Sequence, residues 1–149
     1  MLYLIVKFVH VVLAIVALGS NLTYGVWFVR AQAHPESAET IVRGIKFIDD
    51  RIANPAYGLL LVTGLLEAYI GGYGMGTKWI DMALGLYVIL VIVAVTLYSP
   101  TLKKQIAAVA AGGVESPEAR TLASRGTAVG IALGVIALGI VFLMVVKPT

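Results

Sequence analysis

The chain contains no cysteine among its 149 residues. This absence excludes disulfides, thiolate metal sites and thiol nucleophiles. Charge is also scarce, since 13% of the residues are charged against about 25% in a typical soluble domain. The chain has no phosphate-binding glycine loop, no serine nucleophile elbow and no paired-histidine zinc motif. The sequence therefore carries none of the signatures by which common soluble enzymes are recognised.

Long apolar runs take the place of the missing charge, and 60% of the residues are hydrophobic. About 20 apolar residues in a helix cross the ~30 Å hydrocarbon core of a bilayer. Four stretches approach this length, at about 8–28, 55–70, 79–98 and 127–146. We therefore predict an all-α fold: a bundle of four transmembrane helices, with short amphipathic cytoplasmic helices, in a single integral membrane domain over 1–149.

Lysine and arginine are distributed unevenly between the two sides of this bundle. The connections between the first and second spans and between the third and fourth hold eight of the eleven: Arg30, Arg43, Lys46, Arg51, Lys103, Lys104, Arg120 and Arg125. Because positive residues gather on the cytoplasmic side, we predict a multi-pass protein of the cytoplasmic (inner) membrane with both termini outside the cytoplasm. The net charge of +3 follows from this asymmetry and does not indicate nucleic-acid binding.

The first long connection, "HPESAETIVRGIKFIDDRIANP", has isoleucines at helical spacing at positions 41, 45, 48 and 52. This pattern predicts an amphipathic helix lying on or against the cytoplasmic interface. Asn54 followed by Pro55 predicts a new helix start, with Asn54 as the N-cap and Pro55 in the first turn. Ser99 and Pro100 similarly predict the end of the third span.

Ionisable residues inside a bilayer are costly, so each one needs a reason. In the predicted topology, His10, Glu67 and Asp81 come from three different helices and lie at similar depth on the outer side. Asn21 lies deeper, on the same helical stripe as His10. We therefore take His10, Asn21, Glu67 and Asp81 as candidate cofactor-binding residues and His10 as a candidate metal ligand.

Several functions fit this group. Neutral imidazole is a ligand for haem iron, so His10 could hold haem b in a redox protein, with Glu67 and Asp81 setting the electrostatics or handling protons. A histidine with two carboxylates also suits a divalent metal such as zinc or iron, or proton transfer. The alternative is that His10 and Asn21 only join helices by hydrogen bonds. The protein would then be a cofactor-free scaffold, an accessory subunit or a small transporter.

The stretch "FIDDRIANPAYG" is a second candidate region. Asp49 and Asp50 favour the positive N-terminal end of the helix that follows, and Arg51 suits the membrane interface. A docking or substrate-binding role is the alternative for these residues.

Glycine recurs every four residues in the fourth span, at Gly126, Gly130 and Gly134. Small residues at this spacing allow two helix backbones to approach closely. The partner helix belongs either to the same chain or to a second copy, which would make a homodimer.

Three passages carry a resemblance: "LIVKFVHVVLAIVALGSNL", "IDDRIANPAYGLLLVTGL" and "WIDMALGLYVILVIVAVTLYSP". Together they resemble a family of small bacterial predicted integral membrane proteins of unknown function. The chain is also distantly similar to membrane protoporphyrinogen oxidases of the HemJ type and to membrane proteins of the CopD type. The first of these similarities implies that His10, within "KFVH", matches a histidine associated with haem b. No second axial ligand has a match in this sequence.

Overall fold

The computed structural model describes residues 1–74 and 76–148, which are almost entirely helical and contain no strand. The α-helices are α1 (Leu2–Ala33), α2 (Ala38–Ile48), α3 (Asn54–Ile70), α4 (Lys78–Val93), α5 (Ser99–Gly112) and α6 (Pro117–Val146). A short 3-10 turn, η1 (Pro35–Ser37), precedes α2, and two π-helical segments are η2 (Asp49–Ala53) and η3 (Ala94–Tyr98). The all-α prediction is therefore confirmed.

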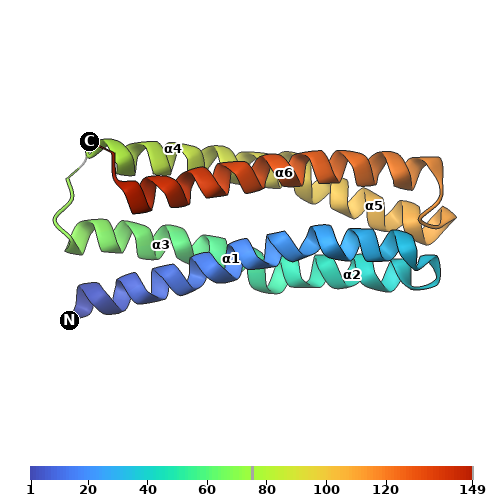
Figure 1. The fold of residues 1–149 in the computed structure, drawn as a ribbon, viewed down its shortest axis with the longest axis horizontal. Coiled ribbons are helices and arrows are strands. Elements are labelled where there is room, and N and C mark those ends of the chain that lie inside the picture. Colours follow the sequence, from blue (N-terminus) through green and yellow to red (C-terminus); the bar gives the residue numbers. More distant parts are fainter. Residues whose placement is uncertain (75, 149) are drawn as a thin grey trace.

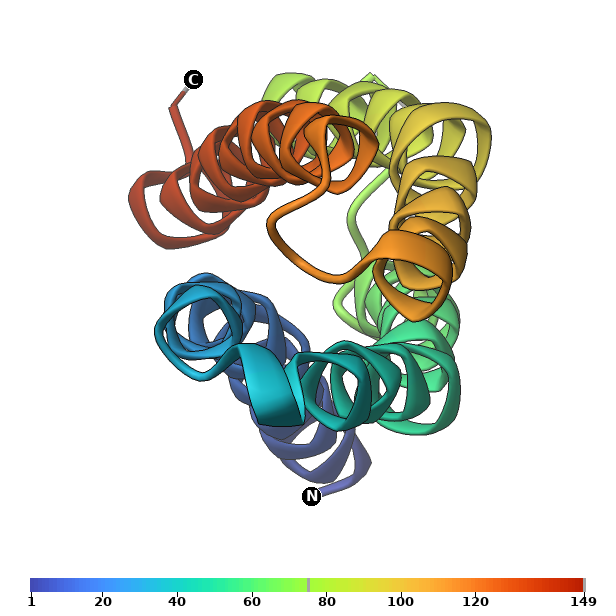
Figure 2. The ribbon, with the colours of Figure 1, turned by 90° about the vertical axis from the view of Figure 1, so that its right-hand side faces the viewer.

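The helices form four long rods: α1, α2–η2–α3, α4–η3–α5 and α6 (Figure 1). Both chain termini lie at one end of the bundle, which we call the terminal end, together with the turn between α3 and α4. The segments that join α1 to α2 and α5 to α6 lie at the other end, the connection end. Figure 2 shows the rods end-on, with α1, α2 and α3 on one side and α4, α5 and α6 on the other.

Pro55 lies in the first turn of α3, as predicted, but Pro100 does not end a helix, contrary to the sequence-based prediction. Each follows a π-helical segment of five residues, η2 or η3, and the helix continues through it. The amide of Asn54 donates to the carbonyl of Asp49, so Asn54 is inside a helix and is not an N-cap. A proline lacks an N–H and its ring clashes with the carbonyl four residues earlier. The wider π turn relieves this clash without breaking the rod.

Three helical segments are long and apolar enough to cross a membrane: Leu2–Ala33, Lys78–Gly112 and Pro117–Val146. They contain the predicted first, third and fourth spans. The predicted second span, 55–70, does not meet the same criterion, so residues 1–74 and 76–148 hold three candidate spans where the sequence predicted four. The α2–η2–α3 rod is long enough, but it carries polar residues such as Asp49, Asn54 and Glu67 along its length.

The buried core is concentrated toward the connection end. There Val42 and Ile45 of α2 are almost completely buried, and they cluster with Leu102 and Val109 of α5. The face of α2 that was predicted to lie on the membrane interface therefore packs inside the bundle, against α1 and α5. Toward the terminal end large apolar side chains are exposed, for example Phe8, Leu65 and Phe142, as expected for a surface in contact with lipid.

The glycines of α6 pack mainly within the chain. A Cβ on Gly126 would lie 3.6 Å from the Gln105 side chain, and one on Gly130 would lie 3.7 Å from the Tyr98 ring. These two glycines therefore face α5 and η3 of the same chain, with room for a methyl group at ordinary contact distance. No other side chain comes within 4 Å of a Cβ built on Gly134, and the homodimer stays a prediction.

Candidate functional site

His10 lies between α1 and α3, and its ring is hydrogen-bonded across the two helices. The Nδ1 atom is 2.8 Å from the Thr63 hydroxyl oxygen. That hydroxyl also lies 2.8 Å from the backbone carbonyl of Leu59 and 3.3 Å from that of Leu60. In the tautomer with the proton on Nδ1, His10 donates to Thr63 and a lone pair stays on Nε2. The ring rests on Gly64, whose missing side chain makes room for it: a Cβ there would lie 3.1 Å from Cε1.

Glu67 belongs to the same contact between α1 and α3, and Asp81 does not. The hydroxyl of Tyr3 donates to Glu67 at 3.3 Å, one turn along α3 from Thr63. Asp81 is exposed on α4, which packs against α6 and has no close backbone contact with α1 or α3. The structure therefore brings His10 and Glu67 to the same helix pair but does not produce the predicted convergence with Asp81.

The residues around His10 do not form a group of three metal-ligating side chains. Across 1–74 and 76–148, no three His, Asp or Glu side chains are grouped closely enough to hold a metal ion. His34 is at the connection end, half-exposed, with Nδ1 3.4 Å from Glu36. One protein ligand is enough for a five-coordinate haem. However, His10 lines neither of the two cavities described below.

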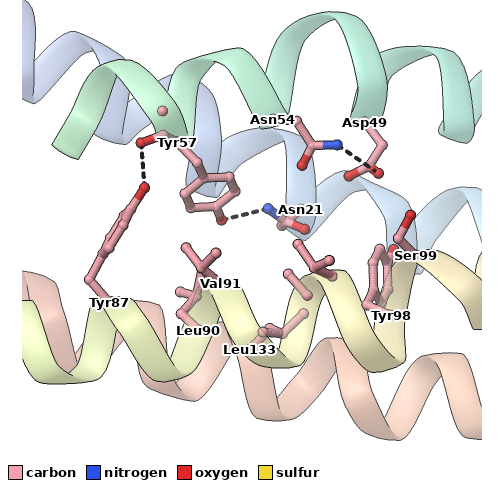
Figure 3. Close-up of a pocket in the computed structure, with 13 residues that line it drawn as sticks. Asn21, Asp49, Asn54, Tyr57, Tyr87, Leu90, Val91, Tyr98, Ser99 and Leu133 are labelled. Carbon is pink, nitrogen blue, oxygen red and sulfur yellow. Dashed lines mark hydrogen bonds between the residues drawn. The ribbon is translucent and has the colours of Figure 1, made fainter. Parts of the chain in front are cut away.

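Asn21 lies away from His10, in a cavity of about 340 Å³ midway along the bundle, which we call the central cavity (Figure 3). The polar residues in its wall are Asn21, Asp49, Asn54, Tyr57, Tyr87, Tyr98 and Ser99, and apolar residues such as Leu90, Val91 and Leu133 complete it. Residues of both π-helical segments are included. Because π-helical segments are frequent at functional sites, the central cavity is the stronger candidate site.

Hydrogen bonds hold the wall of the central cavity in place. The Asn21 side-chain amide donates to the Tyr57 hydroxyl at 2.7 Å and to the backbone carbonyl of Ala17 at 3.0 Å. Asn21 therefore joins α1 to α3, as the interhelical alternative predicted. The hydroxyl of Tyr87 donates to the backbone carbonyl of Tyr57 at 2.8 Å. This bond crosses from α4 to α3, two helices that have no close backbone contact.

Asp49 is the one carboxylate among the residues that line the central cavity. It is 5% exposed, and its hydrogen-bond partner is the Asn54 amide at a long 3.4 Å. Lys46, whose charge acts on Asp49, donates to Asp50 instead. Burial raises the pKa of the Asp49 carboxyl above its ordinary value, and Lys46 opposes the shift. An ionised Asp49 is thus a poorly compensated charge.

A second cavity, of about 560 Å³, lies at the connection end between α1, α2, α5 and α6. Its polar lining includes Gln32, Gln105, Glu115, Arg120, Ser124 and Thr127. Glu115 and Arg120 form an ion pair and are well exposed. The second cavity therefore reaches solvent at this end of the bundle.

A family model described as "predicted integral membrane protein (DUF2269)" matches residues 4–148, almost the whole chain. The chain belongs to this family. No curated protein and no solved structure matches it. Membership of DUF2269 confirms the predicted membrane family of unknown function and the bilayer as the surroundings of this protein. The resemblance to HemJ-type and CopD-type proteins is not shown.

In this DUF2269 protein the sequence pointed to part of the central cavity. Asn21 and the Asp49–Arg51 stretch were singled out, but Tyr57, Tyr87 and Tyr98 were not. A signal was present, since these tyrosines all lie within or beside the predicted spans, where a hydroxyl needs a partner. The sequence did not reveal that the π-helical segments before Pro55 and Pro100 bring these tyrosines to the same position along the bundle.

Proposed function

We propose that this DUF2269 protein binds a small organic cation in its central cavity, as a small transporter or carrier in the membrane. The observation that supports this is Asp49, a buried carboxylate that lines a cavity and has a single long hydrogen bond. A buried charge needs a counter-charge, and Lys46 is engaged by Asp50. A cationic ligand would supply the missing positive charge.

The rest of the wall suits an organic cation better than a bare metal ion. Tyr57, Tyr87 and Tyr98 offer aromatic rings, which attract cations through their electron-rich faces. Leu90, Val91 and Leu133 would contact the apolar groups of the ligand. A volume of about 340 Å³ is within the range of pockets for small molecules. A metal ion would need several oxygen ligands, and Asp49 is the single carboxylate in this wall.

Tetraethylammonium is a suitable probe, because it has a positive charge, apolar arms and no hydrogen-bond donor. We expect it to raise the thermal unfolding temperature of the purified protein. At 100 times its dissociation constant a ligand stabilises a protein by about 2.7 kcal/mol. The affinity should increase with pH, since the cation competes with a proton for Asp49. The Asp49→Asn variant should bind at least about tenfold more weakly, a loss of ~1.4 kcal/mol.

Asp81→Asn is the matched control, because Asp81 is exposed on α4 and outside the cavity. It should bind tetraethylammonium as the wild type does. Equal protection of the wild type and Asp49→Asn, or no protection of either, would show that the cavity does not select cations through Asp49.

Haem b bound through His10 is the second candidate, and a separate observation favours it. In the tautomer with the proton on Nδ1, His10 donates to Thr63 and keeps a lone pair on Nε2. Histidines that ligate metals commonly donate their other ring N–H in this way. Haem would supply one-electron redox chemistry, while Thr63 would orient the ring and Glu67 would contribute negative charge beside it.

A visible absorption spectrum of protein expressed with ample haem tests this candidate. Haem held by His10 is expected to give a Soret band that His10→Ala abolishes or shifts and His34→Ala leaves unchanged. His34 is the control because it lies at the connection end, paired with Glu36. A colourless wild type would contradict haem binding and leave His10 as a residue that joins α1 to α3.

We further propose that all four rods cross the inner membrane, with both termini outside the cytoplasm. The α2–η2–α3 rod is continuous, so the crossing segment need not stop at Asn54. Asp49 precedes Ile70 by about 32 Å of helix at 1.5 Å per residue, which matches the ~30 Å hydrocarbon core. At the terminal end the Lys147 ammonium lies 5.2 Å from the Trp79 ring, and such aromatic and basic groups are typical of a membrane interface.

A further inference from the structure

In the part of the chain that the structure describes, two buried polar atoms have no hydrogen-bond partner, one at the second cavity and one near Asp49. They are the hydroxyl oxygen of Tyr24 and the side-chain carbonyl oxygen of Gln105. Tyr24 is 2% exposed and Gln105 is 3% exposed. Leaving such an atom unpaired costs about 1–3 kcal/mol, and ordered water is the usual partner of a buried polar group that lacks one.

A line of buried polar side chains joins the cavities along one helix face. Tyr98, Thr101 and Gln105 are three and four residues apart, so they lie on the same face of η3 and α5. Tyr98 lines the central cavity and Gln105 lines the second cavity, and Thr101 between them is 5% exposed. We call these three residues the polar stripe.

The α6 helix leaves space beside the polar stripe. Gly126 faces both Gln105 and Thr101, at 3.6 and 3.8 Å from the position a Cβ would take, and Gly130 faces Tyr98. Glycine at these positions keeps side chains of α6 away from the stripe. Seven residues separate Tyr98 from Gln105, or about 10 Å of helix. Three or four waters at hydrogen-bond spacing of about 2.8 Å would span this distance.

We propose that water enters beside the polar stripe, where the two unpaired polar atoms need partners, and that protons from solvent at the connection end reach Asp49 through the second cavity and along the stripe. The step is a simple protonation: a hydronium ion gives its proton to the Asp49 carboxylate, leaving a neutral carboxylic acid and water. The groups that surround Asp49 are Lys46 and Asp50 on its own rod, Tyr24 on α1, Tyr57 on α3 and Tyr98 on η3. Of these, Tyr98 belongs to the polar stripe, and Tyr24 carries one of the two unpaired polar atoms.

This inference deepens the proposed function, since a proton that reaches Asp49 from one side competes there with the cation. It does not depend on cation binding, however, because water and protons follow the same path in a protein that binds no cation. The two proposals therefore fail in different experiments.

The absence of cysteine allows a direct test with single cysteine variants. Thr101→Cys is nearly isosteric and places a thiol on the stripe. Ala137→Cys is the matched control, because Ala137 is similarly buried, 6% against 5% exposed, but is part of the apolar core. The probe is the small cationic reagent aminoethyl methanethiosulfonate, which reacts with thiolates in water. We expect Thr101→Cys to react at least about tenfold faster than Ala137→Cys, and only when the reagent is on the connection side.

A second measurement follows the proton itself. After a jump to acidic pH, the infrared carbonyl band of protonated Asp49, identified by its loss in Asp49→Asn, reports the rate of protonation. Gln105→Leu should slow this rate at least about tenfold. Thr96→Val should not, because the Thr96 hydroxyl is exposed and donates to its own helix at Ile92. Equal reactivity of the two cysteine variants, or an unchanged protonation rate in Gln105→Leu, would overturn the proposal.

Discussion

The Asp49→Asn variant is expected to be more stable than the wild type at neutral pH. Burial raises the pKa of Asp49, so the folded state favours the neutral acid. The contribution of Asp49 to stability is therefore greatest below its unfolded pKa of about 3.9, and it is lost as the pH rises through the folded pKa. Above the folded pKa the protein carries the full cost of a buried charge. Asparagine keeps the shape and removes the charge.

We expect a gain of about 1–3 kcal/mol, the typical cost of a poorly satisfied buried polar group. This gain corresponds to several degrees in thermal unfolding temperature for a chain of this length. It should shrink as the pH is lowered through the folded pKa, where the wild-type carboxyl takes up its proton. Thermal unfolding in detergent between pH 4 and 8 measures both effects.

Asp81→Asn again serves as the control, since an exposed carboxylate should change stability by less than about 0.5 kcal/mol at any of these pH values. A loss of stability in Asp49→Asn at neutral pH would mean that Lys46 compensates the Asp49 charge after all. The expected result, greater stability together with weaker cation binding, would mark Asp49 as a functional residue kept at a cost in stability.

The sequence predicted the helices of this protein better than the positions of its polar side chains. Apolar length is enough to locate long helices. The start of α6 has the local signals of a helix N-terminus: Ser116 accepts from the amide of Ala119 as an N-cap, with Pro117 next. Pro100 was misinterpreted because a proline in sequence indicates a break. Whether a π turn absorbs it instead depends on the packing of neighbouring rods.

The structure does not bring Asp81 to the helix pair that holds His10 and Glu67. Equal depth in a bilayer was taken as proximity, but depth does not determine which helices are neighbours. The turn between α3 and α4 joins the two helices at the terminal end, yet α4 packs against α6 and α3 packs against α1. Asn21 was correctly interpreted as a residue that joins helices, because a buried amide needs a partner wherever its helix packs.

Cysteines placed at the two ends of the bundle are expected to be accessible from opposite sides of the membrane. Ser37→Cys lies at the connection end, in the segment between α1 and α2, and Gly74→Cys lies in the exposed turn between α3 and α4. Because the chain has no native cysteine, each variant carries a single thiol. In intact spheroplasts a membrane-impermeant maleimide should label Gly74→Cys nearly completely. It should leave Ser37→Cys unlabelled until the membrane is opened.

This pair of positions tests the one span that length and composition do not support. If α3 stayed on the cytoplasmic side, positions 37 and 74 would lie on the same side and label alike. Labelling of Ser37→Cys alone would mean that four rods cross in the inverted orientation, against the excess of lysine and arginine at the connection end. Opposite labelling with Gly74→Cys outside would establish α3 as a span. Asp49 would then lie at the inner boundary of the hydrocarbon core, and the polar stripe would lie between it and the cytoplasm.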